Sequence, residues 1–307
     1  MDNKNLTVIR EIILLGFSKD PTINSGLFVL FFVIYVVTFF GNALMIHIVL
    51  QNSQLHIPMY YFLCILSILD LCYSTTILPK LLADLFSSYR AILIWGCGIQ
   101  IYVTLLVEGC ECLLLATMAY DRYVAICQPL HYPVVMCWSM CYKMTALIFV
   151  ASFLMCTLPS LLSPIAICYN QMNHFMCELL AFLKLACNTI SFSELQIFCI
   201  SFISLLLPFV FILGSYACIL SSILNIQSAG RSKAFSTCSS HLAVVGLYFG
   251  TAMFMYFGPS SQYSTNLEKY SSIFYVIISP MLNPLIYSFN NKKIKDLCKA
   301  MLKKKVI

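Results

Sequence analysis

Seven long stretches of this chain are apolar and carry few or no formal charges. Crossing the ~30 Å hydrocarbon core of a bilayer takes about 20 residues of α-helix, more than a helix buried in a soluble protein has to fill with apolar residues. The stretches of this length are 26–50, 57–82, 97–120, 141–168, 195–224, 237–259 and 270–289. Only 10% of the 307 residues are charged, against about 25% in an average soluble domain. The sequence therefore predicts an all-α membrane protein, a seven-transmembrane helix bundle forming one domain over 1–307.

The basic residues indicate how this bundle is oriented. Seven spans place the termini on opposite sides of the membrane, and the 18 Lys and Arg residues divide eleven to seven in favour of the side that holds the C-terminal tail. Because basic loops stay in the cytoplasm, we expect an extracellular N-terminus over 1–25 and a cytoplasmic tail over 290–307. Asn5, in the glycosylation acceptor Asn5-Leu6-Thr7, then lies outside the cell. Residues 1–24 lack the pattern of a cleavable signal peptide.

The tail after Phe289 mixes apolar and basic residues with helical spacing. Ile294, Leu297 and Met301 recur at intervals of three and four among lysines. This pattern predicts a short amphipathic helix on the inner membrane surface, where anionic lipid attracts basic residues. We expect membrane lipid as the partner of this tail, and no nucleic acid, since no soluble domain is attached to it.

Four of the 16 cysteines stand apart from the rest. Most lie inside the apolar stretches, where Cys behaves as a small apolar side chain. Cys97, Cys168, Cys177 and Cys187 lie in or beside the predicted outer loop at 169–193, in an oxidising compartment. We predict the disulfides Cys97–Cys177 and Cys168–Cys187, although four cysteines permit three pairings and the sequence alone does not choose among them. Such bonds would hold the loop over the mouth of the bundle.

No familiar catalytic motif is present. The chain has no His-Glu-x-x-His, no Walker-type Gly-Lys-Ser/Thr, no Cys-x-x-Cys and no Gly-x-Ser-x-Gly sequence, so an enzyme is not expected. An acid exposed to lipid costs about 2.5 kcal/mol or more, so acids retained inside the spans indicate a function. Asp70, Glu108 and Glu111 are such acids.

The third span carries a stripe of residues from one end to the other. Its members recur at alternating spacings of four and three: Thr104, Glu108, Glu111, Leu115, Met118 and Arg122. From Glu108 to Arg122 the helix rises roughly 21 Å at about 1.5 Å per residue. Plain packing is the ordinary explanation for the apolar members. The acids predict that this face runs from an outer pocket to the inner surface.

Asp70 and Glu111 are expected at similar depth on the second and third spans. Two carboxylates in a dry bundle cannot both stay ionised without compensation. Either they hold a cation such as sodium, or they share a proton as a hydrogen-bonded pair, and both alternatives remain open. Asn42, Ser279 and Asn283 could complete this polar cluster.

Two short motifs lie at the predicted inner ends. Asp121-Arg122-Tyr123 ends the third span, and Asn283-Pro284 with Tyr287 lies in the seventh. A proline removes a backbone hydrogen bond and kinks a helix, so Pro284 is a candidate hinge.

Four segments carry a resemblance to a known family. They read Leu-His-Ile-Pro-Met-Tyr at 55–60, Met-Ala-Tyr-Asp-Arg-Tyr-Val-Ala-Ile-Cys at 118–127, Lys-Ala-Phe-Ser-Thr-Cys-Ser-Ser-His-Leu at 233–242 and Pro-Met-Leu-Asn-Pro-Leu-Ile-Tyr at 280–287. In these segments the chain resembles the rhodopsin-like G-protein-coupled receptors, and more narrowly the odorant receptors of the tetrapod type. The four segments occur in order over the whole chain, which makes the match specific.

The resemblance implies a receptor in the plasma membrane of olfactory cilia. It implies a small volatile odorant bound among helices three, five, six and seven, and a stimulatory olfactory-type Gα subunit that raises cyclic AMP. The implied ligand-binding residues are Thr104, Leu105, Glu108, Ile200, Ser201, Ser204, Met253, Tyr256 and Ile273. The implied switch residues are Asp121, Arg122, Tyr123, Tyr216, Tyr248, Phe249, Pro284 and Tyr287. Activation would release Arg122 from Asp121, and the internal acids of the family match Asp70 and Glu111.

Two positions depart from the family pattern. Tyr248-Phe249-Gly250 has its two aromatic residues in the reverse of the usual order, which leaves the hydrogen bonding of the switch open. Glu108 stands where the family often has a small residue. An ionised Glu108 would favour amine ligands, whereas a protonated one would donate a hydrogen bond to carbonyl or alcohol odorants.

Two other classes of membrane protein share some of these features. A transporter or channel would also explain buried acids and a kinked helix, but it predicts internal repeats, and none is found in the sequence. A membrane enzyme would need a nucleophile or metal-type His cluster beside the acids, which the sequence does not supply.

Overall fold

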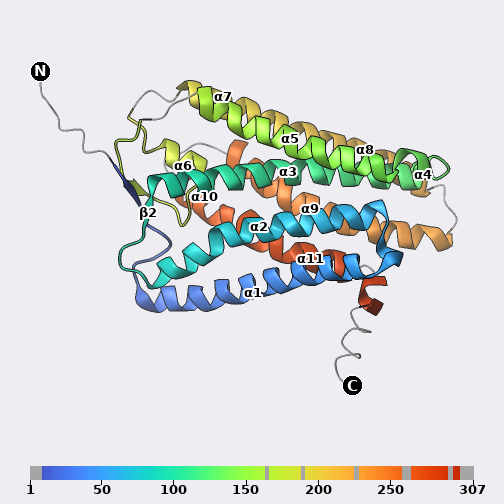
Figure 1. The fold of residues 1–307 in the computed structure, drawn as a ribbon, viewed down its shortest axis with the longest axis horizontal. Helices are drawn as coiled ribbons and strands as arrows, with labels where there is room; N and C mark the ends of the chain where they lie inside the picture. Colours follow the sequence, from blue (N-terminus) through green and yellow to red (C-terminus); the bar gives the residue numbers. More distant parts are fainter. Residues whose placement is uncertain are drawn as a thin grey trace, which may run out of the picture.

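Long helices run side by side in the computed structural model, which describes residues 9–162, 166–187, 191–224, 228–257, 264–289 and 293–297 (Figure 1). The first four spans are α1 (Pro21–Gln51), α2 (Pro58–Phe86), α3 (Ile94–Cys127) and α5 (Trp138–Leu162). The fifth joins α7 (Ser191–Ser201), the π-helical η2 (Phe202–Leu206) and α8 (Leu207–Leu224). The sixth is α9 (Ser228–Phe257), and the seventh joins α10 (Ser264–Ile273), the π-helical η3 (Phe274–Ile278) and α11 (Ser279–Phe289).

These helices form the predicted seven-transmembrane bundle. Six of them, within the described ranges, are long and apolar enough to cross a membrane, and the seventh span is the one divided by η3. The predicted stretches match the seven spans, although the fifth and seventh are each divided by a π-helical segment. The fourth stretch was expected to reach Cys168. In the structure Cys168 lies in the loop, and α5 ends at Leu162.

The bundle exposes apolar side chains on its outer face and buries polar ones among an apolar core. Val29 and Phe40 of α1 are about two-thirds exposed, whereas Asn42 of the same helix and Asp70 of α2 are fully buried. A soluble bundle would not present so apolar an outer face, because it must remove apolar surface from water. In lipid the outer face has no such requirement, and polar groups are satisfied only between helices.

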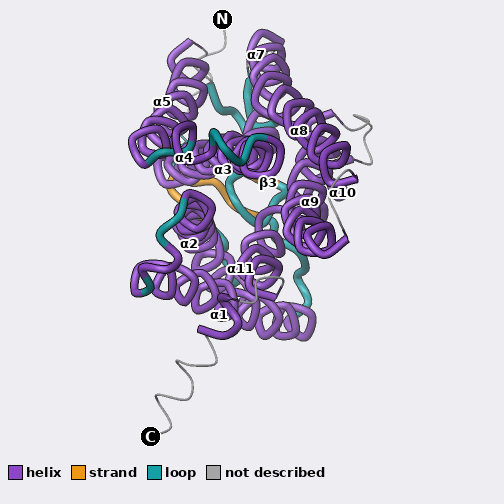
Figure 2. The backbone as a smooth tube through the Cα atoms, turned by 90° about the vertical axis from the view of Figure 1, so that its right-hand side faces the viewer, coloured by secondary structure: helices purple, strands orange, loops and turns teal. Residues whose placement is uncertain are grey.

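Helix α3 lies at the centre and contacts α2, α5 and α8 (Figure 2). Gly109 allows α3 to approach α5 closely, because a Cβ atom at this position would lie 3.2 Å from Ser152 Oγ. Small residues play this role widely where membrane helices pack. The residue beside Gly109 is Glu108, so the close contact fixes the position of that acid.

One end of the bundle carries a small sheet that the sequence analysis did not predict. Strand β1 (Glu11–Leu14) lies between β2 (Ala91–Leu93), which is antiparallel to it, and β3 (Gln171–Met172), which is parallel. Ile12 and Leu14 of β1 are buried. We call this the sheet end and the opposite end, where α3 finishes, the Arg122 end.

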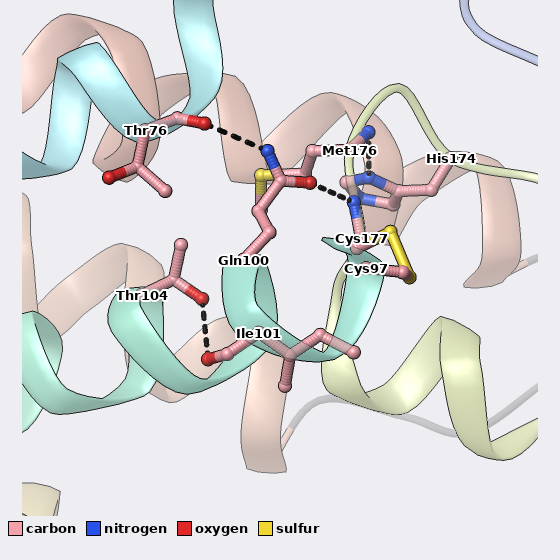
Figure 3. Close-up of a disulfide and its surroundings, with 8 residues drawn as sticks. All are labelled: Thr76, Cys97, Gln100, Ile101, Thr104, His174, Met176 and Cys177. Atoms are coloured by element: carbon pink, nitrogen blue, oxygen red, sulfur yellow. Dashed lines mark hydrogen bonds between the residues drawn. A yellow bond between two sulfur atoms is a disulfide. The ribbon is translucent and has the colours of Figure 1, made fainter. Parts of the chain in front are cut away.

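The structure contains both predicted disulfides, Cys97–Cys177 and Cys168–Cys187. Figure 3 shows Gln100 beside the first of them. The Gln100 Oε1 atom accepts a hydrogen bond from the Cys177 backbone N at 2.8 Å, and its Nε2 atom donates to the Thr76 carbonyl oxygen at 2.9 Å. The loop is therefore held to α3 by a covalent bond and to α2 through one glutamine.

Two short helices connect the spans at opposite ends. Helix α6 (Leu179–Leu183) lies in the loop between α5 and α7, and Glu178 caps it by accepting a hydrogen bond from the Ala181 backbone N at 2.8 Å. Helix α4 (Tyr132–Val135) follows α3, and a 3₁₀ turn, η1 (Ser53–Leu55), follows α1.

In the predicted amphipathic tail, residues 293–297 are helical, with Ile294 buried and Lys293 and Lys295 exposed. The rest of that tail, and Asn5, lie outside the described residues.

His174 lies buried beneath the sheet, next to a cation. Its Nδ1 atom accepts from the Met176 backbone N at 3.3 Å, and its Nε2 atom lies 3.4 Å from Ser272 Oγ. Lys269 donates to the Gly16 carbonyl oxygen and to Asn173 Oδ1 close by. Burial, together with the charge of Lys269, lowers the pKa of His174 to about 3.

The sheet end is therefore expected to lose stability in acid. Below its ordinary pKa of about 6.5, His174 binds a proton in the unfolded state and not in the folded one, so the free energy of unfolding falls as the pH drops from 6.5 towards 3. Between pH 7 and 5 this amounts to about 2 kcal/mol. His174→Gln keeps an acceptor without the titration. Thermal unfolding of both proteins at the two pH values should show the smaller loss in the variant, and equal losses would contradict the assignment.

Candidate functional site

A cavity of about 460 Å³ lies between α3, α5, α6 and α7, with α9 and η3 also contributing. Most of its lining is apolar. Five residues expected in a ligand pocket line it: Leu105, Glu108, Ile200, Ser201 and Ser204. The cavity lies towards the sheet end, since Gly98 in the first turns of α3 lines it as well.

Three of the predicted pocket residues do not line this cavity. Thr104 is buried and donates to the Ile101 carbonyl oxygen of its own helix. The face of α3 that lines the cavity follows Ile101, Leu105, Glu108 and Cys112, so the predicted stripe crosses it only at Glu108. Met253 and Ile273 pack against the main apolar core, and Ala252 and Tyr275 line the cavity in their place. The side chain of Tyr256 lies outside the described part of the chain.

Two walls of the cavity were not anticipated. Ser152 and Cys156 of α5 line it, and so do Leu179 and Phe182 of α6. The prediction drew only on spans three, five, six and seven. The fourth span carries no buried acid or polar stripe that would have marked its inner face, and nothing in the loop sequence indicated a helix over the cavity.

Glu108 connects three helices at the cavity wall. Its Oε1 atom accepts a hydrogen bond from the Tyr73 hydroxyl of α2 at 2.7 Å. Its backbone carbonyl oxygen accepts another from the Tyr248 hydroxyl of α9 at 2.9 Å. Tyr73 was not a predicted site residue, although a tyrosine inside an apolar span needs a partner for its hydroxyl and so could have been suspected.

In the reversed aromatic pair Tyr248-Phe249, the tyrosine comes first, so the hydroxyl group is on residue 248. Tyr248 donates to Glu108 and accepts from the Cys112 thiol, with 3.5 Å between Sγ and the phenolic oxygen. Phe249 is fully buried and packs on Phe209, with 5.5 Å between ring centroids. This order therefore fixes the polar contact of α9 to α3 and directs an apolar ring towards α8.

A polar cluster lies deeper in the bundle. Asp70 accepts two hydrogen bonds from Asn283 Nδ2, each at 3.1 Å. Asn42 donates to the carbonyl oxygen of Pro280 at 3.0 Å. Glu111 is buried and close enough to Asp70 for their charges to interact. The structure therefore brings together Asp70, Glu111 and Asn283 of the expected cluster. Asn42 bonds the carbonyl oxygen of Pro280, the residue next to Ser279, whose side chain is also buried.

Several oxygens of this cluster have no hydrogen-bond partner among the described residues. They are Glu111 Oε1, Asn42 Oδ1, Ser279 Oγ and Asn283 Oδ1. Buried polar atoms left unpaired are costly, and oxygen atoms of this kind suit a hard cation. Within the described ranges no three His, Cys, Asp or Glu side chains gather to bind a metal. The two acids would therefore need neutral oxygen ligands beside them to coordinate a cation.

Asp121 is paired differently from the prediction. Its Oδ1 atom accepts from the Tyr132 hydroxyl of α4 at 2.8 Å. Asp121 and Arg122 form no close ion pair, since Lys80–Asp84 is the one ion pair within the described residues, although the charge of Arg122 still acts on Asp121. Neighbouring residues on a helix point about 100° apart, which explains why the two side chains do not form a direct ion pair. Tyr123 accepts from Gln128 Nε2 at 3.4 Å.

The remaining switch residues lie on α8 and α11. The Tyr216 hydroxyl of α8 lies 2.7 Å from His241 Nδ1 of α9. His241 was part of a recognised segment but was not assigned a role, and its Nε2 atom has no partner among the described residues. Pro284 lies against α1, where a Cβ on Gly41 would come within 3.2 Å of its ring, and Tyr287 is buried.

A cavity near one end of a seven-helix bundle, a polar cluster beneath it and an Asp-Arg-Tyr sequence at the far end define a rhodopsin-like, G-protein-coupled receptor. The sequence profile described as olfactory receptor matches residues 31–305. Mouse olfactory receptor 2B6 is 44% identical over 98% of this chain and 97% of its own. Human olfactory receptor 2K2 is 44% identical over 99% and 97%, and the dog olfactory receptor-like protein OLF3 is 43% identical over 98% and 96%. The chain belongs to the olfactory receptor family, which consists of signalling receptors and not of enzymes.

Proposed function

We propose that this receptor binds a small volatile odorant in the cavity of about 460 Å³ and activates a stimulatory, olfactory-type G protein that raises cyclic AMP. The observation that carries this proposal is the position of Glu108. It lines the cavity, and its backbone carbonyl oxygen accepts the hydroxyl of Tyr248 on α9. A ligand in the cavity therefore acts next to the contact that joins α9 to α3.

The size and lining of the cavity suit a small apolar ligand. Ligand sites are mostly apolar, with a few polar groups that set orientation, and here Ser201, Ser204 and Glu108 can do so. Ligand binding stabilises one arrangement of the helices over another. The contacts that differ between the two arrangements would include Tyr248 to Glu108 and Tyr216 to His241, since both tie α9 to a neighbour.

The Arg122 end would receive the G protein in the cytoplasm, with the sheet end outside the cell. Arg122 has no ion-pair partner among the described residues, so a partner protein can engage it without first breaking a bond to Asp121. The basic C-terminal tail supports the same orientation through anionic lipid. As a member of the olfactory receptor family, the receptor would lie in the plasma membrane of olfactory cilia.

A sodium ion in the polar cluster would act as an allosteric ligand. Asp70 and Glu111 would supply the negative charge, and the unpaired oxygens of Asn42, Ser279 and Asn283 would complete the coordination. Such an ion would also resolve the repulsion between two buried carboxylates, which otherwise have to share a proton.

The proposal is tested by measuring cyclic AMP in cells that express the receptor together with the olfactory-type Gα subunit. Wild-type protein at the cell surface should respond to members of a broad odorant panel. Arg122→Ala should lose the response while keeping its surface level, because it lies far from the cavity. A well-expressed wild type that responds to nothing in the panel, or an Arg122→Ala variant with full activity, would contradict the proposal.

A further inference from the structure

We propose that the preferred ligands of this receptor are small apolar amines, bound as ammonium ions by the Glu108 carboxylate. This inference rests on the proposed function of the cavity as the odorant site. It identifies the chemical class of the odorant, which membership of the family leaves open.

The charges around the cavity support an ammonium ligand. Glu108 is the one formally charged residue among the described residues that line it, and these include no Lys, Arg or His. Glu108 has no basic partner within the described ranges, because the one ion pair they contain joins Lys80 to Asp84. A carboxylate in an apolar cavity is stabilised strongly by a counter-charge, and here a ligand is the group able to supply it.

The hydrogen bonds of Glu108 hold its carboxyl group as an acceptor. The Tyr73 hydroxyl donates to Oε1 at 2.7 Å, and a hydroxyl directed at a carboxyl group favours its charged form. No described residue bonds to Oε2. One oxygen is thus fixed by the protein, and the other can accept from a ligand N–H.

A second acid adds to the negative potential. Glu178, at the start of α6, is close enough to Glu108 for their charges to interact. Two carboxylates near one another repel, and an ammonium ion placed at Glu108 relieves that repulsion. A neutral odorant would leave it in place.

The rest of the cavity suits the apolar part of such an amine. Tyr102, Tyr248 and Tyr275 line it, and aromatic faces attract cations when water is excluded. Leu105, Ile200 and other aliphatic residues can pack against an alkyl or aryl body. The combination of one acid, several rings and an apolar wall fits a primary amine of moderate size, such as cyclohexylamine or 2-phenylethylamine.

Recognition at Glu108 also explains how such a ligand would signal. The same residue presents its carbonyl oxygen to Tyr248 of α9. An ammonium ion drawn to the carboxylate pulls on the turn of α3 that holds α9. An amine therefore acts on the contact between these helices more directly than a ligand that touches only the apolar wall.

The test compares cyclic AMP responses to matched pairs: cyclohexylamine with cyclohexanol, and 2-phenylethylamine with 2-phenylethanol. Wild type should respond to each amine at lower concentration than to its alcohol. Glu108→Gln, which keeps the shape and removes the charge, should raise the half-maximal concentration for the amines by about 30-fold or more, since it leaves a buried charge unpaired. The alcohols serve as the reference for any general effect of the substitution, and the loss for each amine should exceed that for its matched alcohol by about tenfold or more. Glu108→Asp should retain part of the preference for amines.

Each outcome decides one of the two claims. Surface levels, measured with an N-terminal epitope tag, normalise all responses. If wild type responds to the alcohols and not to the amines, or if Glu108→Gln keeps full amine responses, the amine assignment is wrong and the odorant receptor stands. If Glu108→Gln fails to reach the surface, the wild-type comparison of amines with alcohols and the Glu108→Asp variant still decide. If surface-expressed wild type responds to no odorant of any class, the proposed function itself fails.

Discussion

Cys97→Ser is expected to remove most of the folded receptor from the cell surface. The disulfide from Cys97 to Cys177 spans 80 residues, and closing a loop of that length stabilises the folded state by about 4.5 kcal/mol in the chain-entropy model. It also fixes the segment that carries β3 and α6, and therefore one wall of the cavity. The loss should appear as a fall in surface staining and as a lower melting temperature of purified protein.

The second disulfide offers a matched comparison. Cys168–Cys187 spans 19 residues, so Cys168→Ser should cost about 3 kcal/mol and leave more protein at the surface than Cys97→Ser does. Cys72→Ser, at an exposed free cysteine, should behave as wild type. If Cys97→Ser reached the surface as well as Cys72→Ser, the loop would be held by its non-covalent contacts, chiefly those of Gln100.

The length of the apolar stretches predicted the helices well, because the thickness of the bilayer sets a minimum that few other folds meet. The deep polar cluster was predictable for a related reason. Asp70 and Asn283 are costly in lipid, so they had to meet inside the bundle. They do so through two hydrogen bonds, although 213 positions separate them in the sequence.

The cavity was predicted less well, because a helical stripe defines a face only to within about one residue, or 100°. Thr104 shares a stripe with Glu111, and both turn towards the interior of the bundle, away from the cavity. The π-helical segments add to this error. Each inserts an extra residue into a turn, so positions on one side of η3, such as Ile273, lie out of phase with Tyr275.

Strand β1 could not be predicted from its own residues. Glu11–Leu14 is too short to show an alternating pattern, and it is a strand because β2 and β3 supply hydrogen bonds from 91–93 and 171–172. The pairing of Asp121 with Tyr132 has a similar origin. The short helix α4 places that hydroxyl, and nothing in the Asp-Arg-Tyr motif indicates it.

Asn283→Leu is expected to destabilise the receptor by about 3 kcal/mol, since hydrogen bonds to a charged group contribute about 1.5–3 kcal/mol each and Asp70 would lose both of those it receives from Asn283. Asn42→Ala, which removes bonds to neutral carbonyl oxygens, should cost about 1 kcal/mol. Melting temperatures of purified protein at equal ionic strength measure both.

The double variant Asp70→Leu with Asn283→Leu tests whether the stability of the cluster depends on the Asp70–Asn283 hydrogen bonds and on a bound cation. Replacing both partners by apolar residues of similar size removes the unpaired carboxyl group, so most of the lost stability should return. If a sodium ion stabilises the cluster, wild type should melt at a higher temperature in sodium chloride than in choline chloride, and the double variant should not distinguish the two salts. A double variant less stable than Asn283→Leu would show that Asp70 is held by groups other than Asn283. A wild type indifferent to the cation would leave Asp70 and Glu111 as a pair sharing a proton, with no part for sodium.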